Sequence, residues 1–314
     1  MARKGKAPPR HEVTKRRLAR WQRERRRRRI TIALGMLVVA IVIVIIGYGM
    51  YATVIAPSSQ LLSTVNGTAI TAADYREALR LYPYLGSPEA PLLMLEGNEL
   101  VRQGAGAYGI IVTDDEVTQE IRLLFEEGGE PLSDTVFQER YQQMLSSIGI
   151  SAERFRWFIA ADLLQEKLDQ YLRDQVPEVG ALVPQVHVQT ILVDTEEDAA
   201  AVVGKLDEGE DFPSLAEGYK DGDLGWLPRG IMSPDFDAVA FSTAIGERSE
   251  PFSTAEGYYI IKVVEGEDRA LDEDVKGQLE ANAFSYWLEE ETGEKVERKV
   301  GEEDLEKIYQ WAIE

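Results

Sequence analysis

The uncharged run from Ile30 to Tyr51 is the feature that most constrains this chain. It reads ITIALGMLVVAIVIVIIGYGMY, and no charged residue follows it until Asp74. About 20 consecutive apolar residues in a helix span the hydrocarbon core of a bilayer. The sequence therefore predicts a transmembrane helix over residues 30–51.

Charge is distributed very unevenly on the two sides of this run. Residues 1–29 contain fourteen Lys and Arg against two Glu, a net charge of +12. The whole chain carries −21, so residues 30–314 carry −33. The block Arg25–Arg29 directly precedes the apolar run, and such basic flanks stay on the cytoplasmic side. We therefore expect a basic cytoplasmic tail over 1–29 and an acidic body on the other side of the membrane.

Two alternatives to an anchor concern the same N-terminal region. A cleavable signal peptide has a shorter apolar core than this run, although Val54-Ile55-Ala56 resembles a cleavage site followed by Pro57. An arginine-rich tail can also bind nucleic acid. A short basic flank next to an apolar helix favours a topology signal, so we predict an uncleaved anchor and no nucleic-acid partner.

The composition excludes several classes of chemistry. The chain has no cysteine, which rules out disulfides, thiolate metal sites and a cysteine nucleophile. His11 and His187 are its two histidines, and His11 lies in the basic tail. No phosphate-binding loop, metal-ligand cluster or serine triad is recognisable, which argues against a histidine-dependent hydrolase. We expect neither a cofactor nor a metal.

Helix signals dominate residues 58–178. Asn66-Gly67 indicates a turn, and Thr71, Thr113 and Ser151 each stand where a helix N-cap is expected. Apolar residues then recur at helical spacing. A further amphipathic helix is indicated within 268–314 by Val275, Leu279, Phe284 and Leu288, and the final segment EEDLEKIYQWAIE predicts a short helix that either packs on the others or docks a partner.

Residues 184–266 carry a series of motifs in a specific order. The pieces are Gly222-Asp223-Leu224-Gly225-Trp226, Arg229-Gly230 with Met232, the pair Phe236 and Phe241, and Gly257-Tyr258-Tyr259-Ile260-Ile261-Lys262-Val263. This order resembles the parvulin (rotamase) family of peptidyl-prolyl isomerases. The resemblance implies a small domain with an antiparallel sheet and no cofactor.

The region before these motifs also resembles a known group. Three pieces carry the resemblance: Val65-Asn66-Gly67 with Ile70-Thr71, Ala107-Tyr108-Gly109-Ile110, and Gly149-Ile150-Ser151. They are similar to the helical chaperone region of SurA-type and PrsA-type extracytoplasmic foldases. The resemblance implies an α+β chain with a helical chaperone domain over 58–178, a parvulin-like domain over 184–266, and C-terminal helices over 268–314 that pack back on the chaperone domain.

Isomerisation of an X-Pro bond needs an apolar seat for the proline. The barrier of about 20 kcal/mol is the partial double bond of the amide, and a site that holds the twisted amide better than the planar one lowers it. The resemblance assigns this seat to Leu227, Met232, Phe236 and Phe241. The alternative is that these side chains are ordinary core residues.

The polar side of the site departs from the family pattern. The family has two histidines, and their positions are occupied here by Thr190 and Tyr259. Asp221, in a short loop, could stand in for a third polar group. His187 lies three residues before Thr190 and on a strand points to the opposite face. Thr190, Tyr259 and Asp221 are therefore the candidate catalytic residues.

The resemblance implies two functions for the body of the chain. The first is a peptidyl-prolyl isomerase that acts on X-Pro segments of unfolded or exported polypeptides, outside the bacterial cytoplasmic membrane. The second is a non-catalytic holdase or scaffold that keeps the parvulin fold as a peptide-binding module, which the missing histidines favour. The oligomeric state is open.

Overall fold

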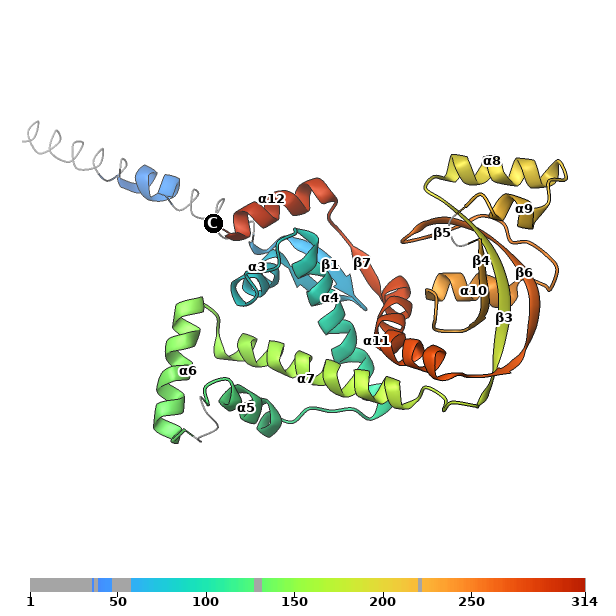
Figure 1. Ribbon diagram of the computed structural model, residues 1–314. Helices are drawn as coiled ribbons and strands as arrows, with labels where there is room; N and C mark the ends of the chain where they lie inside the picture. Colours follow the sequence, from blue (N-terminus) through green and yellow to red (C-terminus); the bar gives the residue numbers. More distant parts are fainter. Residues whose placement is uncertain (1–35, 37–38, 47–57, 127–131, 220–221, 314) are drawn as a thin grey trace, which may run out of the picture. The chain divides into compact units, whose positions relative to one another are not determined.

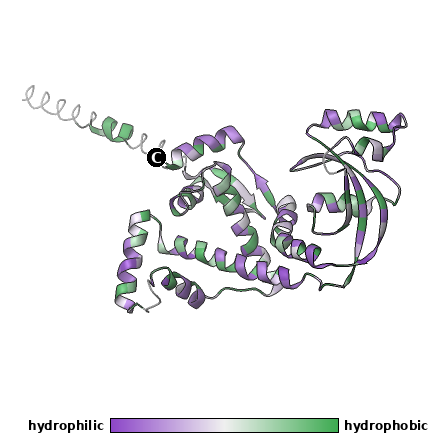
Figure 2. Ribbon diagram, viewed as in Figure 1, coloured by the Kyte–Doolittle hydropathy of each residue, from purple (hydrophilic) through white to green (hydrophobic). Residues whose placement is uncertain are grey.

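The computed structural model describes Met36 and residues 39–46, 58–126, 132–219 and 222–313. Residues 1–29 lie outside this range, as does most of the predicted membrane segment. The described part of that segment is helical, and its residues 39–46 are all hydrophobic (Figure 2). Within the described residues, no helix has both the length and the apolarity needed to cross a bilayer. The chain divides into two compact units, 1–60 and 61–314, and the second is described below.

The second unit begins with a hairpin of strands β1 (Leu61–Val65) and β2 (Thr68–Thr71). The turn residues Asn66 and Gly67 have φ values of 49° and 80°. Positive φ at both central residues is the geometry that matches the twist of a two-residue hairpin. The third strand of this sheet comes from the far end of the chain, because β7 (Val296–Arg298) pairs antiparallel with β1.

Helices follow the hairpin as the cap residues predicted. Thr71 accepts a hydrogen bond from the Asp74 amide, Thr113 accepts one from the Glu116 amide, and both form capping boxes. Ser151 caps the longest helix of this segment. The elements are α3 (Ala72–Leu81), α4 (Glu89–Gly104), the 3-10 helix η2 (Ala105–Tyr108), α5 (Asp114–Leu123), α6 (Asp134–Ile148) and α7 (Ala152–Asp174).

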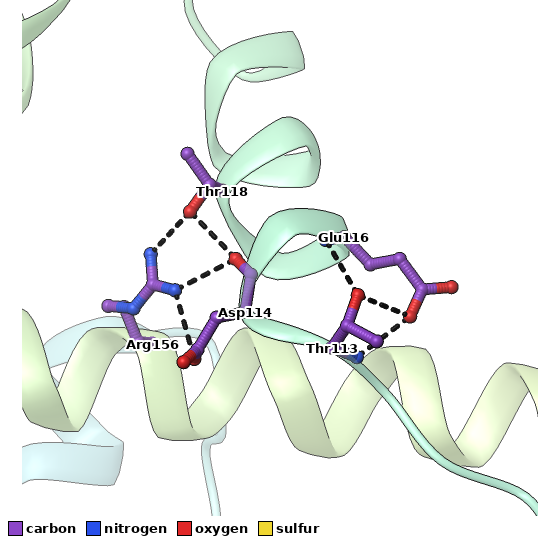
Figure 3. A network of polar contacts seen from close by, with 5 residues as sticks. All are labelled: Thr113, Asp114, Glu116, Thr118 and Arg156. Atoms are coloured by element: carbon purple, nitrogen blue, oxygen red, sulfur yellow. Dashed lines mark hydrogen bonds and ion pairs between the residues drawn. The ribbon is translucent and has the colours of Figure 1, made fainter.

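Figure 3 shows how the start of α5 is held against α7. Arg156 of α7 donates to the Thr118 hydroxyl at 3.0 Å and to the Asp114 carbonyl at 3.0 Å. Lys167, further along α7, pairs with Glu116. The N-terminal turn of α5 therefore has its polar groups satisfied by the helix on which it packs.

The chain segment that follows α7 forms a second sheet. Its strand order is β4-β3-β6-β5, and every neighbouring pair is antiparallel. Helices α8 and α9 cover one face and α10 covers the other (Figure 1). A mixed fold with an antiparallel sheet is thus confirmed. The elements are β3 (Leu182–Val193), α8 (Glu196–Asp207), α9 (Phe212–Ala216), β4 (Asp223–Pro228), α10 (Pro234–Ser242), β5 (Phe252–Thr254) and β6 (Gly257–Ala270).

The C-terminal segment returns to the N-terminal helices. Helix α11 (Glu273–Lys295) packs against α7, α4 and α10. Helix α12 (Glu302–Ile313) packs against α3, and its Leu305 and Ile308 are buried in the same core as Tyr75 and Phe158. This core therefore combines residues from both ends of the second unit.

Close packing and an ion pair to a buried glutamate join the C-terminal segment to α4. A Cβ added to Gly104 of α4 would lie 2.7 Å from the Trp287 ring of α11, so glycine permits the two helices to approach. Arg298 of β7 pairs at 3.0 Å with Glu96 of α4, whose side chain is 3% exposed.

Candidate functional site

A cavity of about 290 Å³ lies beside α10. Three segments of the parvulin-like domain line it: the loop after β4 at residues 230–233, the β5–β6 turn at 254–256, and Tyr259 on β6. Phe236 of α10 also lines it, and α11 supplies the remaining wall. The cavity is therefore bordered by the antiparallel-sheet domain and by a helix that follows it in sequence.

Three aromatic rings form a corner of this site. Phe236 is 1% exposed and meets the Tyr259 ring edge-on, with centroids 5.3 Å apart at 85°. Phe252 stacks on Tyr259 at 5.9 Å and meets Phe236 at 6.0 Å. Edge-to-face rings of this kind stabilise one another beyond simple burial. Phe236 and Tyr259 line the cavity together with Met232, and Phe252 packs against both rings.

The start of α10 sets the position of Phe236. Ser233 is the N-cap, and its hydroxyl accepts a hydrogen bond from the Phe236 amide at 3.3 Å. Pro234 follows at the start of the helix, where a backbone N–H has no partner within the helix, so proline sacrifices no hydrogen bond there. The preceding loop is closed onto the helix, since the Gly230 amide donates to the Asp237 carboxylate at 2.7 Å. Gly230 has a φ of 95°, which suits glycine.

Tyr259 and Thr190, the two positions at which the sequence departs from the family pattern, lie on the same face of the sheet. The Tyr259 hydroxyl donates to the carboxylate of Glu256 in the β5–β6 turn. Thr190 pairs with Ile261 on β6, and Leu192 pairs with Tyr259. Side chains two residues apart on a strand share a face, so Thr190 and Tyr259 both point to the side covered by α10.

The residues predicted from the sequence occupy different places in the structure. Met232, Phe236 and Tyr259 line the cavity. Leu227 and Phe241 belong to the adjoining core cluster, where the Arg229 guanidinium lies 4.1 Å from the Phe241 ring centroid. Thr190 is 1% exposed and is not among the cavity-lining residues. Asp221 lies outside the described residues. His187 is hydrogen-bonded at 2.8 Å to Asp223 of β4.

Sequence reasoning missed one entire wall of the cavity. Glu256 was not singled out, and neither was the polar face of α11. That face consists of positions i, i+3, i+4 and i+7, which lie on one side of a helix. This spacing of polar residues is a sequence signal for such a face. The α11 residues that line the cavity are Asn282, Ser285, Tyr286 and Glu289.

Partial burial raises the pKa of several ionisable groups around the cavity. Burial raises the pKa of Asp237, although its hydrogen bonds with the Gly230 amide and the Tyr286 hydroxyl oppose the shift. Burial, followed by the charge of Asp237, raises the pKa of Tyr286. Burial and then the charge of Asp235 raise the pKa of Glu289. Among the described residues that line the cavity, Glu256 and Glu289 are acidic and none is basic.

No group of three or more His, Asp or Glu within the described residues has an arrangement that could hold a metal ion. The side chains that line the cavity provide an apolar seat, hydroxyls, the amide of Asn282 and the carboxylates of Glu256 and Glu289. That set can bind a peptide segment and contact its carbonyl groups without covalent chemistry.

Comparisons with known proteins agree with this arrangement. The Rotamase family, a PPIC-type PPIASE domain, matches residues 189–265. The foldase protein PrsA of Caldanaerobacter subterraneus subsp. tengcongensis is 30% identical over 278 residues, covering 79% of this chain and 85% of that protein. PrsA of Geobacillus sp. strain WCH70 is 31% identical over 185 residues, covering 54% of this chain and 62% of that protein.

A solved structure is also similar. The crystal structure of the peptidylprolyl isomerase PrsA from Bacillus anthracis has 23% sequence identity and a TM-score of 0.32, covering 71% of this chain and 95% of that one.

The sheet, its three helices and the matched family define a parvulin-type peptidyl-prolyl isomerase domain carried by a helical body. The match to PrsA of Caldanaerobacter covers 79% of this chain and therefore extends well beyond this domain. The chain belongs to the PrsA family of foldases.

Proposed function

We propose that this protein is an extracytoplasmic folding factor that binds X-Pro segments of exported polypeptides in the cavity beside α10 and isomerises them. The observation that carries the proposal is the aromatic corner of Phe236 and Tyr259, which stands next to Met232 and a tyrosine hydroxyl in one cavity. The apolar seat can hold the proline ring, and the hydroxyl beside it can contact the amide as it rotates.

The proposed mechanism uses binding and one polar contact. The proline ring packs on Met232 and Phe236, which fixes one side of the X-Pro bond. Rotation removes charge from the carbonyl oxygen and returns a lone pair to the nitrogen, because amide resonance is lost. The Tyr259 hydroxyl is both donor and acceptor, so it can exchange its Glu256 partner for an atom of the rotating amide. Stabilisation that grows with rotation lowers the barrier.

A non-catalytic holdase is the second candidate. Thr190 stands where the family has a histidine, and it is buried away from the cavity lining. On this reading the cavity binds proline segments without accelerating their rotation. Leu227 and Phe241 then support the cavity from the core behind it, and Asp221 is the remaining candidate polar group.

A protease-coupled assay on residues 58–314 tests the two candidates. The isomerase predicts that the cis fraction of an Ala-Pro reporter peptide is consumed faster with protein present. Met232→Ala should lower kcat/KM about tenfold, because about 1.4 kcal/mol of apolar contact is lost. Val203→Ala is the matched control, since Val203 is a partly buried residue of α8, which covers the other face of the sheet.

The outcomes separate the candidates. Binding of the peptide without acceleration, weakened by Met232→Ala, would favour the holdase. Equal losses in Met232→Ala and Val203→Ala would contradict the assignment of the cavity as the peptide site.

We also propose that residues 30–51 anchor the protein in the cytoplasmic membrane. The run has no charged residue, which suits a membrane span. The arginine block before it supports an orientation with residues 1–29 inside and the domains 58–178, 184–266 and 268–314 outside. Protease added to spheroplasts should then degrade the body and spare the tail. A mature protein that begins at Pro57 and washes off the membrane would contradict the anchor.

A further inference from the structure

The α11 wall of the cavity is attached to the loop that carries Met232. The Asn282 side-chain amide donates to the carbonyl oxygens of Gly230 at 3.3 Å and Ile231 at 3.2 Å. Leu279 packs so close to Gly230 that an added Cβ would lie 3.1 Å from its Cδ2. The Tyr286 hydroxyl reaches Asp237 of α10. Because of these contacts, α11 is a built part of the site.

Two carboxylates from different elements make the cavity acidic. Glu289 lines it from α11, Glu256 lines it from the β5–β6 turn, and Asp235 is close enough to raise the pKa of Glu289. Glu256 is hydrogen-bonded to Tyr259. Within the described part of the chain, Glu289 forms no ion pair. Arg229, the basic residue that follows β4, lies over the Phe241 ring and donates to the Asp237 carbonyl oxygen, and it does not line this cavity.

We propose that the site selects proline segments in which a lysine or arginine flanks the proline. The proline packs on Met232 and Phe236, and the cationic side chain binds the carboxylates of Glu256 and Glu289. The selectivity rests on the proposed function, since it concerns the same cavity. A client acidic on both sides of the proline is repelled by the same two groups.

The size of the preference follows from the exposure of these carboxylates. Both are open to solvent at the mouth of the cavity, and exposed ion pairs contribute modestly. Two such pairs give a preference of roughly three- to tenfold for a basic over an alanine flank. Salt screens charges at this exposure, so the preference declines at high ionic strength.

The test is a fluorescence titration of the full chain in detergent with three labelled peptides. They are identical except that alanine, lysine or glutamate occupies both positions next to the proline. We expect the lysine peptide to bind three- to tenfold tighter than the alanine peptide, and the glutamate peptide to bind weakest. Glu289→Gln should reduce the lysine-to-alanine ratio, and so should about 0.5 M salt.

Glu290→Gln is the matched control because it removes the same charge one residue further along α11, where the side chain lines a different cavity. It should keep the wild-type ratio. An equal fall in both variants would show that the acidic body as a whole attracts the peptide, and would overturn the proposal. Equal affinity for the lysine and alanine peptides would overturn it too, while leaving the proposed function intact. Absence of saturable binding by all three peptides would overturn both.

Discussion

Tyr259 combines a packing role and a polar role in one side chain. Its ring is held by Phe236 and Phe252, and its hydroxyl donates to Glu256. Tyr259→Phe keeps the ring and removes the hydroxyl. If the hydroxyl follows the rotating amide, kcat/KM for an Ala-Pro peptide should fall about tenfold, which corresponds to 1.4 kcal/mol.

Thermal unfolding distinguishes this loss from a loss of fold, because the melting temperature should change little when the ring packing remains. A Tyr259→Phe protein with wild-type kcat/KM would exclude the hydroxyl from the reaction.

Glu116 links the start of α5 to α7 and titrates in an acidic window. The hydrogen bond from Lys167, followed by those from Thr113, lowers the pKa of Glu116 from 4.5 to about 2. The folded value lies below the unfolded one, so this stabilisation is present above about pH 4.5 and is lost as the pH falls toward 2. Glu116→Gln should therefore weaken the acid-induced loss of stability in this window.

Urea unfolding at pH 7 and pH 3 measures the effect as the change in unfolding free energy between the two values. Asp115→Asn serves as the control, because Asp115 is exposed at the same helix start. An equal effect of both substitutions would contradict a specific role for the Glu116–Lys167 pair.

The site residues differ in how far sequence could predict them. Phe236 and Met232 follow a glycine turn in a motif with fixed spacing, so their proximity to the cavity follows from the local chain. Thr190 was assigned by its position in the motif, but its burial depends on the neighbouring strand and on α10. Glu289 lies 53 positions after Phe236, and a contact over that distance has no local signal.

Gly104 shows how one element depends on another. Glycine within a helix is ordinarily unfavourable by about 1 kcal/mol relative to alanine. Here an added Cβ would meet the Trp287 ring at 2.7 Å, and Trp287 is 5% exposed and hydrogen-bonded to Tyr108. Gly104→Ala should destabilise the protein by about 1–3 kcal/mol, because the ring has little freedom to shift.

Chemical denaturation with Gly106→Ala as the reference checks this, since an added Cβ at Gly106 meets nothing within 4 Å. Stabilisation by Gly104→Ala would show that helix propensity outweighs the steric contact.

Elements were predictable where their signals were local. Thr71, Thr113 and Ser151 each mark a helix start that the structure contains. Strand β7 was not predicted, because Val296–Arg298 is too short to show an alternating pattern. Its pairing with β1, more than 200 residues away along the chain, creates the strand. Long-range pairing of this kind lies beyond what periodicity can reveal.

At the scale of the whole molecule, the body has two separate sets of cores. One set comprises a cluster of α3, α4 and α7 with β1 and α12, a cluster of α5 and α6 with α7, and a cluster of α4 and α7 with α11. The N-terminal helices therefore pack on elements from the end of the second unit. The other set lies on the two faces of the four-stranded sheet. The parvulin-like domain is contained in one continuous stretch, which is why its motifs could be read in order from the sequence.

This division predicts that a destabilising substitution in α12 lowers the stability of the N-terminal helices, which are distant in sequence, but not that of the parvulin-like domain. Leu305 and Ile308 are 4% and 5% exposed in the core that holds Tyr75 and Phe158. Truncating either to alanine should cost about 2–5 kcal/mol through lost burial and the cavity left behind. Native-state hydrogen exchange should then show reduced protection over residues 61–174 in Ile308→Ala and unchanged protection over 182–265. Val202→Ala, in the core under α8, should give the reverse pattern. If Ile308→Ala lowers protection equally in both regions, the two sets of cores unfold as one cooperative unit and the division is wrong.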